Sequence, residues 1–275
     1  MLRLLPWPLL FLLSASLAAQ DVRFVPQSRE SIERRLDALA VTNSERAATM
    51  RKLFHEAGCG ERLSDAPVRG AKLPNVVCDL PGERSDTIVV GAHYDKTGAG
   101  QGAIDNWAGV SLLPALFESL ADEPRNHTFI FIAFAEEESG LLGSHSFVRH
   151  LGKDGARRVL AMVNLDSLGL GPTKVGITTS SEHLVRWASA VSRSMKLPLE
   201  GMSYDQVGRS DSASFRAKKI PTIDFHSVTT ETLAVLHSKE DRLDRIARDD
   251  FFESYRLIAA YLALLDTGRA WPAGK

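Results

Sequence analysis

The sequence has no excess of either charge. Its 33 lysine and arginine residues nearly balance 34 aspartate and glutamate residues, which leaves a formal net charge of -1. Such a chain has no overall field that attracts nucleic acid or anionic lipid. We therefore expect neither nucleic acid nor, in the mature chain, a membrane among its partners. Internal repeats and low-complexity tracts are also absent, and 275 residues fit one large α/β domain.

Long apolar runs are missing too, except for a short one at the N-terminus. Arg3 precedes an apolar run over residues 4–13, and small residues up to Ala19 follow it. This run is too short to cross a bilayer comfortably. The pattern predicts a signal peptide over residues 1–19 and a mature domain over residues 20–275, exported to the periplasm or the extracellular space. The alternative is an uncleaved membrane anchor.

Cysteine is scarce. Cys59 and Cys78 are the only two in the chain. An exported protein can keep a disulfide, and a loop of this size would gain about 3 kcal/mol of stability from the bridge. The sequence leaves open whether the two residues form a disulfide or remain free thiols.

Strand-like and helical segments alternate along the mature chain. Short apolar runs predict strands over residues 75–79, 87–91, 128–135, 159–165 and 221–225. Helices are predicted over residues 28–57 (in two parts that meet near 42–43), 106–121, 140–151, 181–195, 211–217 and 249–265. The alternation predicts a single three-layer α/β domain, with helices on both sides of a mixed, mostly parallel sheet.

Two of these segments carry more detailed information. Residues 128–135 are almost wholly apolar, as expected of a central strand that is covered on both faces. Pro114 lies inside the helix predicted over residues 106–121. Because proline lacks a backbone donor, this helix should kink or start late.

Polar residues gather where the predicted strands end. In sheets of this kind, binding sites form at the carboxyl ends of the strands. Five strand ends, or the loops that leave them, carry a histidine or an acid: His93, Asp105, the run Glu136–Glu138, Asp166 and His237. Singly, each fits an ordinary role such as a helix cap, a turn or a solvated acidic face. Together, carboxylates on one buried rim would repel one another unless a cation lay among them.

The ligand types favour particular metals. Two imidazoles and three carboxylates form the mixed nitrogen and oxygen set that zinc, cobalt or manganese accepts. Six segments, in order, resemble the co-catalytic zinc aminopeptidases, a superfamily that also contains glutamate carboxypeptidase II and the glutaminyl cyclases. They are GAHYD, GAIDNWAGV, AEEESGLLGS, NLDSLG, GRSDSASF and LHSKED. Each segment alone is a weak signal, but the ordered set extends over residues 75–246.

The resemblance implies a site with two zinc ions. It pairs His93 with Asp166 on one ion and Glu138 with His237 on the other. Asp105 would bridge the two ions, and the peptide bond that follows Asp105 is expected to be cis. Asp95 would lie behind the ligands and orient them.

The run of three glutamates needs a register. The family pattern is Glu-Glu-x-Gly, with the base first and the ligand second, and Gly140 supplies the glycine. Glu137 is then the general base and Glu138 the ligand; the alternative register moves both roles one residue earlier, to Glu136 and Glu137. Two neighbouring cations would activate a water, and Glu137 would take a proton from that water and pass it to the departing amine. The family implies that a free α-amine of the peptide substrate is recognised, which makes the protein an aminopeptidase.

The substrate side departs from the family. Many relatives have a histidine where this chain has Ser212, so substrate contacts by Asp211 and Ser212 are in doubt. Tyr204 is a candidate for the substrate pocket. Trp107 fits either the pocket rim or the packing of the following helix. Asp241, four residues after His237, fits a supporting or capping role.

Other functions are compatible with the same fold. The main alternative is a glutaminyl-peptide cyclotransferase, which works with one zinc ion and is expected to carry Asp-Asp-His at residues 210–212. This chain has Ser-Asp-Ser there, which favours the peptidase. A carboxypeptidase or dipeptidase relative and a non-catalytic binding module are further alternatives.

Overall fold

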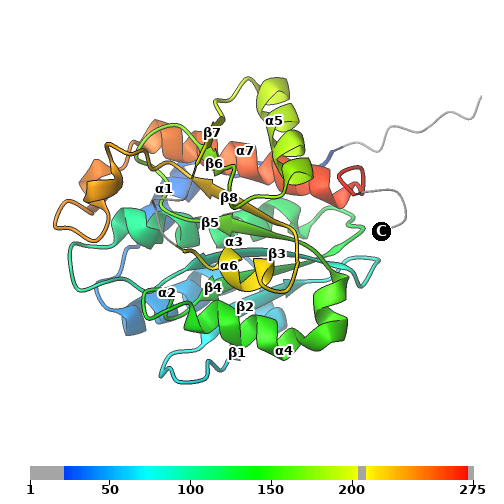
Figure 1. Ribbon diagram of the computed structural model, residues 1–275, viewed down its shortest axis with the longest axis horizontal. Coiled ribbons are helices and arrows are strands. Elements are labelled where there is room, and N and C mark those ends of the chain that lie inside the picture. The colour runs from blue at the N-terminus through cyan, green and yellow to red at the C-terminus, as the bar shows by residue number, and fades with distance from the viewer. Residues whose placement is uncertain (1–21, 204–208, 272–275) are drawn as a thin grey trace, which may run out of the picture.

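An eight-stranded sheet forms the centre of the molecule (Figure 1). The computed structural model describes residues 22–203 and 209–271. The predicted signal peptide and Tyr204 therefore lie outside the described residues. The strands are β1 (Leu63–Ala66), β2 (Asn75–Leu80), β3 (Thr87–His93), β4 (Thr128–Phe134), β5 (Val159–Leu165), β6 (Lys174–Gly176), β7 (Glu200–Met202) and β8 (Thr222–His226).

The sheet is mixed but mostly parallel, as predicted. Its order is β1-β2-β4-β3-β5-β8-β6-β7, and the four central strands β4, β3, β5 and β8 are parallel. Antiparallel pairs join β1 to β2, β2 to β4 and β6 to β8. Every residue of β3 and β5 is buried, which explains their continuous apolar sequence. Sequence reasoning missed β1, β6 and β7 because strands of three or four residues are too short to show a pattern. β1 and β7 are also the two edge strands.

Seven α-helices are described, and most lie where the sequence predicts them. They are α1 (Arg29–Asp37), α2 (Asn43–Glu56), α3 (Gly109–Ala121), α4 (Leu142–Arg158), α5 (Glu182–Met195), α6 (Ser212–Arg216) and α7 (Arg248–Asp266). The region predicted as helix over residues 28–57 is two helices. The second begins at a capping box in which the Thr42 side chain accepts from the Glu45 backbone, and the Glu45 side chain accepts from the Thr42 backbone.

Two helices differ from their predicted bounds. The helix predicted from residue 106 starts at Gly109, but Pro114 lies buried inside it, so the start of the helix is not set by the proline as predicted. An irregular helical segment, η2 (Ala103–Ala108), precedes it and contains the cis peptide bond between Asp105 and Asn106. The helix predicted over residues 140–151 continues to Arg158 as α4, with a break in its helical backbone at Gly152 (φ 63°, ψ -168°). Glycine tolerates this positive φ, so the chain can turn here and resume a helix. The sequence pattern did not indicate that α4 continues beyond this glycine.

Helices cover both faces of the sheet. Ile88, Val90 and Ala92 of β3 join a large core with α1, α2, α3, α5 and α7, while Val89 points to a smaller core on the other face. The smaller core includes Phe215 of α6 and Val148 of α4, and these two helices lie together in the lower part of Figure 1. This alternation along one strand establishes the three layers that the sequence predicts.

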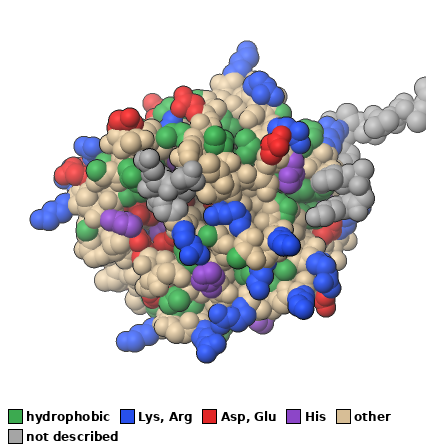
Figure 2. Space-filling view, in the orientation of Figure 1, with side chains coloured by type: hydrophobic (Ala, Val, Ile, Leu, Met, Phe, Trp, Pro, Cys, Tyr) green, Lys and Arg blue, Asp and Glu red, His purple; other side chains and the backbone are tan. Residues whose placement is uncertain are grey.

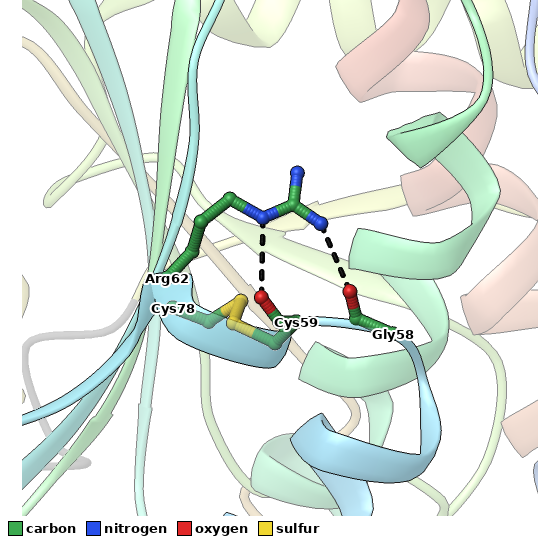
Figure 3. Close-up of a disulfide and its surroundings, with 4 residues drawn as sticks. All are labelled: Gly58, Cys59, Arg62 and Cys78. Atoms are coloured by element: carbon green, nitrogen blue, oxygen red, sulfur yellow. Dashed lines mark hydrogen bonds between the residues drawn. A yellow bond between two sulfur atoms is a disulfide. The ribbon is translucent and has the colours of Figure 1, made fainter.

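A disulfide joins Cys59 to Cys78 and ties the segment after α2 to β2 (Figure 3). Beside it, the Arg62 side chain donates to the backbone oxygens of Cys59 and Gly58, at 3.1 and 2.9 Å. In the part of the chain that the structure describes, none of the helices has the length and hydropathy that a bilayer crossing requires.

Candidate functional site

The predicted rim residues meet at the carboxyl ends of the central strands. His93 is the last residue of β3, Asp166 directly follows β5, and Glu137 and Glu138 lie in the turn after β4. Asp105 comes from η2 and His237 from the long segment after β8. A cavity of about 230 Å³ opens here, lined by His93, Asp105, Glu137, Asp166, Ser167, Arg209, Ser210, Leu233, Leu236 and His237.

Asp105 lies between two separate pairs of side chains. Its Oδ1 is 3.2 Å from Nε2 of His93, and that nitrogen is 3.7 Å from Oδ1 of Asp166. Its Oδ2 is 3.0 Å from Nε2 of His237, which is 3.1 Å from Oε2 of Glu138. Asp105 thus forms two triads, one with His93 and Asp166 and one with Glu138 and His237. In each triad the possible ligand atoms lie within 4.8 Å of one another. One carboxylate thus faces both triads, each with one imidazole and one further carboxylate.

Asp95 holds the glutamate turn and faces His93. Its two carboxylate oxygens accept from the backbone N–H groups of Glu137 and Glu138, at 3.0 and 3.1 Å. One of these oxygens is also 3.5 Å from Nδ1 of His93. Asp95 is buried, so these contacts are shielded from water. The side chain lies where an acid behind the ligands is expected.

The glutamate register can be read from side-chain positions. Glu137 lines the cavity, and Glu138 lies in the triad of Asp105 and His237. Glu136 instead accepts a hydrogen bond from the Ser139 hydroxyl at 2.7 Å and is absent from the cavity lining. This arrangement supports Glu137 and Glu138 over the alternative pair.

The electrostatics of the cluster favour added positive charge. Burial raises the pKa of Glu137 to about 9, and burial with the charge of Asp105 raises that of Glu138 to about 7. The hydrogen bond to Asp105 raises the pKa of His237 to about 9. Burial opposes protonation of His93, but the charge of Glu137 and bonds to Asp105 and Asp166 still raise its pKa well above the usual value. The carboxylates thus attract either protons or a cation.

The donor set fits a pair of divalent cations. Within the described chain, Glu138 Oε1 is a buried oxygen that lacks a hydrogen-bond partner. A buried carboxylate oxygen without a partner is costly, and a cation would satisfy it. Imidazole nitrogen with carboxylate oxygen is the mixture that zinc accepts.

Comparison with known proteins agrees with this geometry. The sequence model of peptidase family M28 matches residues 75–262, well over half of the chain. The chain belongs to peptidase family M28. It is 28% identical over 231 residues to aminopeptidase YwaD of Bacillus subtilis, an alignment that covers 82% of this chain and 48% of that protein. It therefore spans about half the length of this curated relative.

Solved structures show the same M28 fold. The zinc aminopeptidase BSAP of Bacillus subtilis is 25% identical with a TM-score of 0.63, over 70% of this chain and 49% of that one. A glutaminyl cyclase from an Acidobacteriales bacterium has a TM-score of 0.72 at 17% identity, over 90% of this chain and 96% of that one. The second likeness shows the fold alone.

Small polar residues orient the candidate ligands of this M28 chain, and sequence reasoning missed them. Ser210 donates to Oδ2 of Asp166 at 2.6 Å, and Ser167 donates to Oδ1 at 3.0 Å. The Asn106 carboxamide donates to the Leu165 carbonyl at 2.8 Å and accepts from the Ser167 N–H at 3.2 Å. Serine and asparagine are common in loops, so only their position after a strand or beside Asp105 could have drawn attention to them.

Arg46 is a second feature that the sequence did not reveal. It lies in α2 and is fully buried, over the ring of Trp107 at 5.5 Å. Its guanidinium donates to the carbonyls of Tyr94 and Gly102, at 3.1 and 3.0 Å. These bonds tie the loop that links His93 to Asp105 onto the helical layer.

The substrate side differs from the sequence-based expectation. Asp211 and Ser212 are buried, and neither lines the cavity, so their positions do not support direct substrate contact. Trp107 is fully buried and donates to the Leu36 carbonyl, which makes it a packing residue and not part of the pocket rim. The cavity wall instead includes Arg209, Leu233 and Leu236. Arg209 and Leu236 lie inside the segments GRSDSASF and LHSKED, but neither is a histidine or an acid, so the sequence did not single them out.

Proposed function

We propose that this chain is an exported aminopeptidase that works with two zinc ions. The placement of Asp105 carries the proposal, because its two oxygens face two separate pairs of one imidazole and one carboxylate. His93 with Asp166 would hold one ion, Glu138 with His237 the other, and Asp105 would bridge them. When bound, the ions would supply Lewis-acid polarisation of the scissile carbonyl and a water activated at neutral pH.

The chain's own residues supply proton transfer and orientation. The Glu137 carboxylate lines the cavity, where it can accept a proton from the attacking water and return it to the departing amine. Asp95 fixes the backbone of Glu137 and faces His93, so the base and one ligand share a support. The bonds from Ser167 and Ser210 orient Asp166 in the same manner.

The family and the cavity wall support a peptide substrate, and the similarity to an aminopeptidase supports processing from the amino end. Family M28 implies a peptide, and the small cavity fits one terminal residue better than the middle of a chain. Leu233 and Leu236 give its wall an apolar part. The Cys59–Cys78 disulfide supports export, since such bonds persist in oxidising compartments. A signal peptide over residues 1–19 and a peptidase domain over residues 20–275 remain part of the proposal.

A single neutral substitution tests the proposed base. Glu137→Gln should lower kcat on aminoacyl reporter amides by roughly 10²–10⁴-fold, because the carboxamide cannot accept the proton of the water. Zinc content, measured by atomic emission on the purified protein, should stay at the wild-type value. Glu136→Gln, one residue earlier and outside the cavity, should retain activity. An active Glu137→Gln variant, or an inactive Glu136→Gln variant with full zinc, would overturn the assignment.

A further inference from the structure

A second groove lies on a different part of the surface from the metal-binding rim. It has a volume of about 620 Å³ and is formed by the second half of α4 and the segment that joins α6 to β8. Val159 and Pro221, at or next to the amino-terminal ends of β5 and β8, belong to its lining. The metal-binding rim is at the carboxyl ends of the same strands. The two sites therefore lie at opposite ends of the parallel strands.

The walls of this groove are strongly basic. Its lining contains Arg149, Lys153 and Arg157 from α4, with Lys218 and Lys219 from the segment after α6. All five are exposed, and lysine and arginine side chains gather at the lower right of Figure 2, where α4 ends in Figure 1. This concentration is unusual in a chain whose formal net charge is -1.

Acidic side chains do not offset this charge. Asp154 is the only carboxylate in the sequence of α4, and it is paired with Arg157. In the described part of the chain, the other four basic side chains of the groove form no ion pair. Like charges held together repel one another and destabilise the fold slightly unless an anion joins them.

Helix electrostatics account for only part of the arrangement. A basic residue in the last turn of α4, such as Arg157, is stabilised by the helix dipole. Lys218 and Lys219 follow a different helix, yet the fold brings them to the same groove. Arg149 lies in the last turn before the break at Gly152, so the same argument applies to it. Lys153 directly follows that break and has no such local reason to be basic.

The apolar residues at the floor of the groove indicate which class of ligand it can bind. Ala156 and Pro221 are half-buried residues of the lining above the buried Val148, Val159 and Ile220, so the groove offers some apolar contact between charged walls. Among the residues that line it in the described chain, none is aromatic. Single-stranded nucleic acid is usually held by stacking on aromatic rings. Anionic lipid headgroups meet basic clusters by charge alone and would leave the apolar floor of the groove unused. An acidic peptide, with carboxylates for the walls and apolar side chains for the floor, fits better.

We propose that this basic groove binds an acidic, partly apolar segment of a polypeptide. Carboxylates of that segment would pair with the walls, where the guanidinium of Arg149 can hold a carboxylate through two parallel hydrogen bonds. The groove is separate from the metal-binding rim, so this binding does not depend on the proposed peptidase activity.

A binding measurement on the mature protein tests the groove directly. The probe is a short fluorescent peptide of alternating glutamate and leucine, acylated at its amino end so that an aminopeptidase cannot shorten it. Fluorescence anisotropy at low salt should show saturable binding. The Lys218→Gln/Lys219→Gln double variant should bind about tenfold more weakly, because two wall charges are lost. It should melt at or above the wild-type temperature, since it relieves repulsion.

A matched control removes the same charge elsewhere. Arg186→Gln/Arg193→Gln changes two exposed arginines of α5 and should leave binding within about twofold, since charges far from a binding site affect it little. Equal weakening by both double variants would reduce the effect to net charge and overturn the proposal. Tighter binding of a single-stranded oligonucleotide or of anionic lipid vesicles than of the peptide would also overturn it, as would no peptide binding.

Discussion

At the scale of single residues, hydroxyl groups hold the Asp166 carboxylate in place. Ser210 and Ser167 each donate to one of its oxygens, and Asn164 in turn donates to Ser210 at 2.7 Å. These bonds set the orientation of a proposed zinc ligand before any ion arrives. Residues of this kind tune metal affinity more than they stabilise the fold.

Ser210→Ala should therefore weaken zinc binding by roughly 10–100-fold, the usual effect of losing a group that orients a ligand. Competition with a chromogenic chelator measures this affinity. The zinc-free protein should also lose about 1–3 kcal/mol of stability, because the buried Asn164 amide then lacks its acceptor. Ser214→Ala is the matched control, because Ser214 bonds to Ser144 and His145 and not to a ligand. Equal zinc affinity in the wild type and Ser210→Ala would contradict the role given to this hydroxyl.

The sequence predicted the candidate ligands better than the residues that hold those ligands in place. A histidine or an acid directly after a buried strand is rare enough to draw attention, so His93 and Asp166 could be singled out. Ser210, Asn106 and Arg209 lie inside segments that resemble the family, but serine, asparagine and arginine are common on loops and surfaces, so their residue types did not indicate a supporting role. Their positions depend on contacts between segments far apart in the chain, which periodicity and local spacing do not record.

At the scale of elements, the segment after β8 stabilises η2. Asp241 is buried, and its carboxylate oxygens accept from the N–H groups of Ile104 and Asp105 at 2.7 and 3.3 Å. The backbone of the proposed bridging residue is thus held by the same segment that contributes His237. Both contributions to the site come from one loop, which packs against η2.

Removing the Asp241 carboxylate should loosen both η2 and the segment that contributes His237. Asp241→Ala leaves two buried backbone donors without an acceptor, so the free energy of unfolding should fall by about 1–3 kcal/mol. Urea unfolding measures this change, and zinc affinity should fall with it. Asp241→Asn keeps one acceptor oxygen, so its free energy of unfolding should lie between those of the wild type and Asp241→Ala. Asp244→Ala, which removes an exposed acid paired with Arg242, is the control. An Asp241→Ala variant as stable as this control would contradict the account.

Elements were predictable where apolar runs were long. The central strands β3, β4 and β5 could be predicted because both of their faces are buried, but nothing in the sequence indicated that β4 lies between β2 and β3. Strand order depends on side-chain packing across the sheet, and a single sequence does not contain that information. The extension of α4 past Gly152 was hidden for a local reason, since glycine usually marks the end of a helix.

At the scale of the whole molecule, the disulfide links the helical layer to the sheet. Cys59 follows α2 and Cys78 lies within β2, 19 residues further along the chain. Both are buried. A disulfide that closes a loop of this size is expected to act mainly by limiting the conformations of the unfolded chain.

Replacing both cysteines (Cys59→Ala/Cys78→Ala) should lower the free energy of unfolding by about 3 kcal/mol, as expected for a loop of this length. Thermal and urea unfolding measure the loss. A reducing agent should lower the stability of the wild type by a similar amount and leave the double variant unchanged. If the wild type and the double variant unfold at the same urea concentration, the bridge does not stabilise the protein.

The number of zinc ions needed for activity tests the central claim most directly. The mature protein is freed of metal with a chelator, zinc is returned in measured steps, and hydrolysis of an aminoacyl reporter amide is followed at each step. The account predicts that the rate keeps rising until two zinc ions are bound per chain, because Asp105 joins two ligand pairs. Full activity with one zinc ion per chain, or cyclisation of an amino-terminal glutamine without peptide hydrolysis, would contradict it.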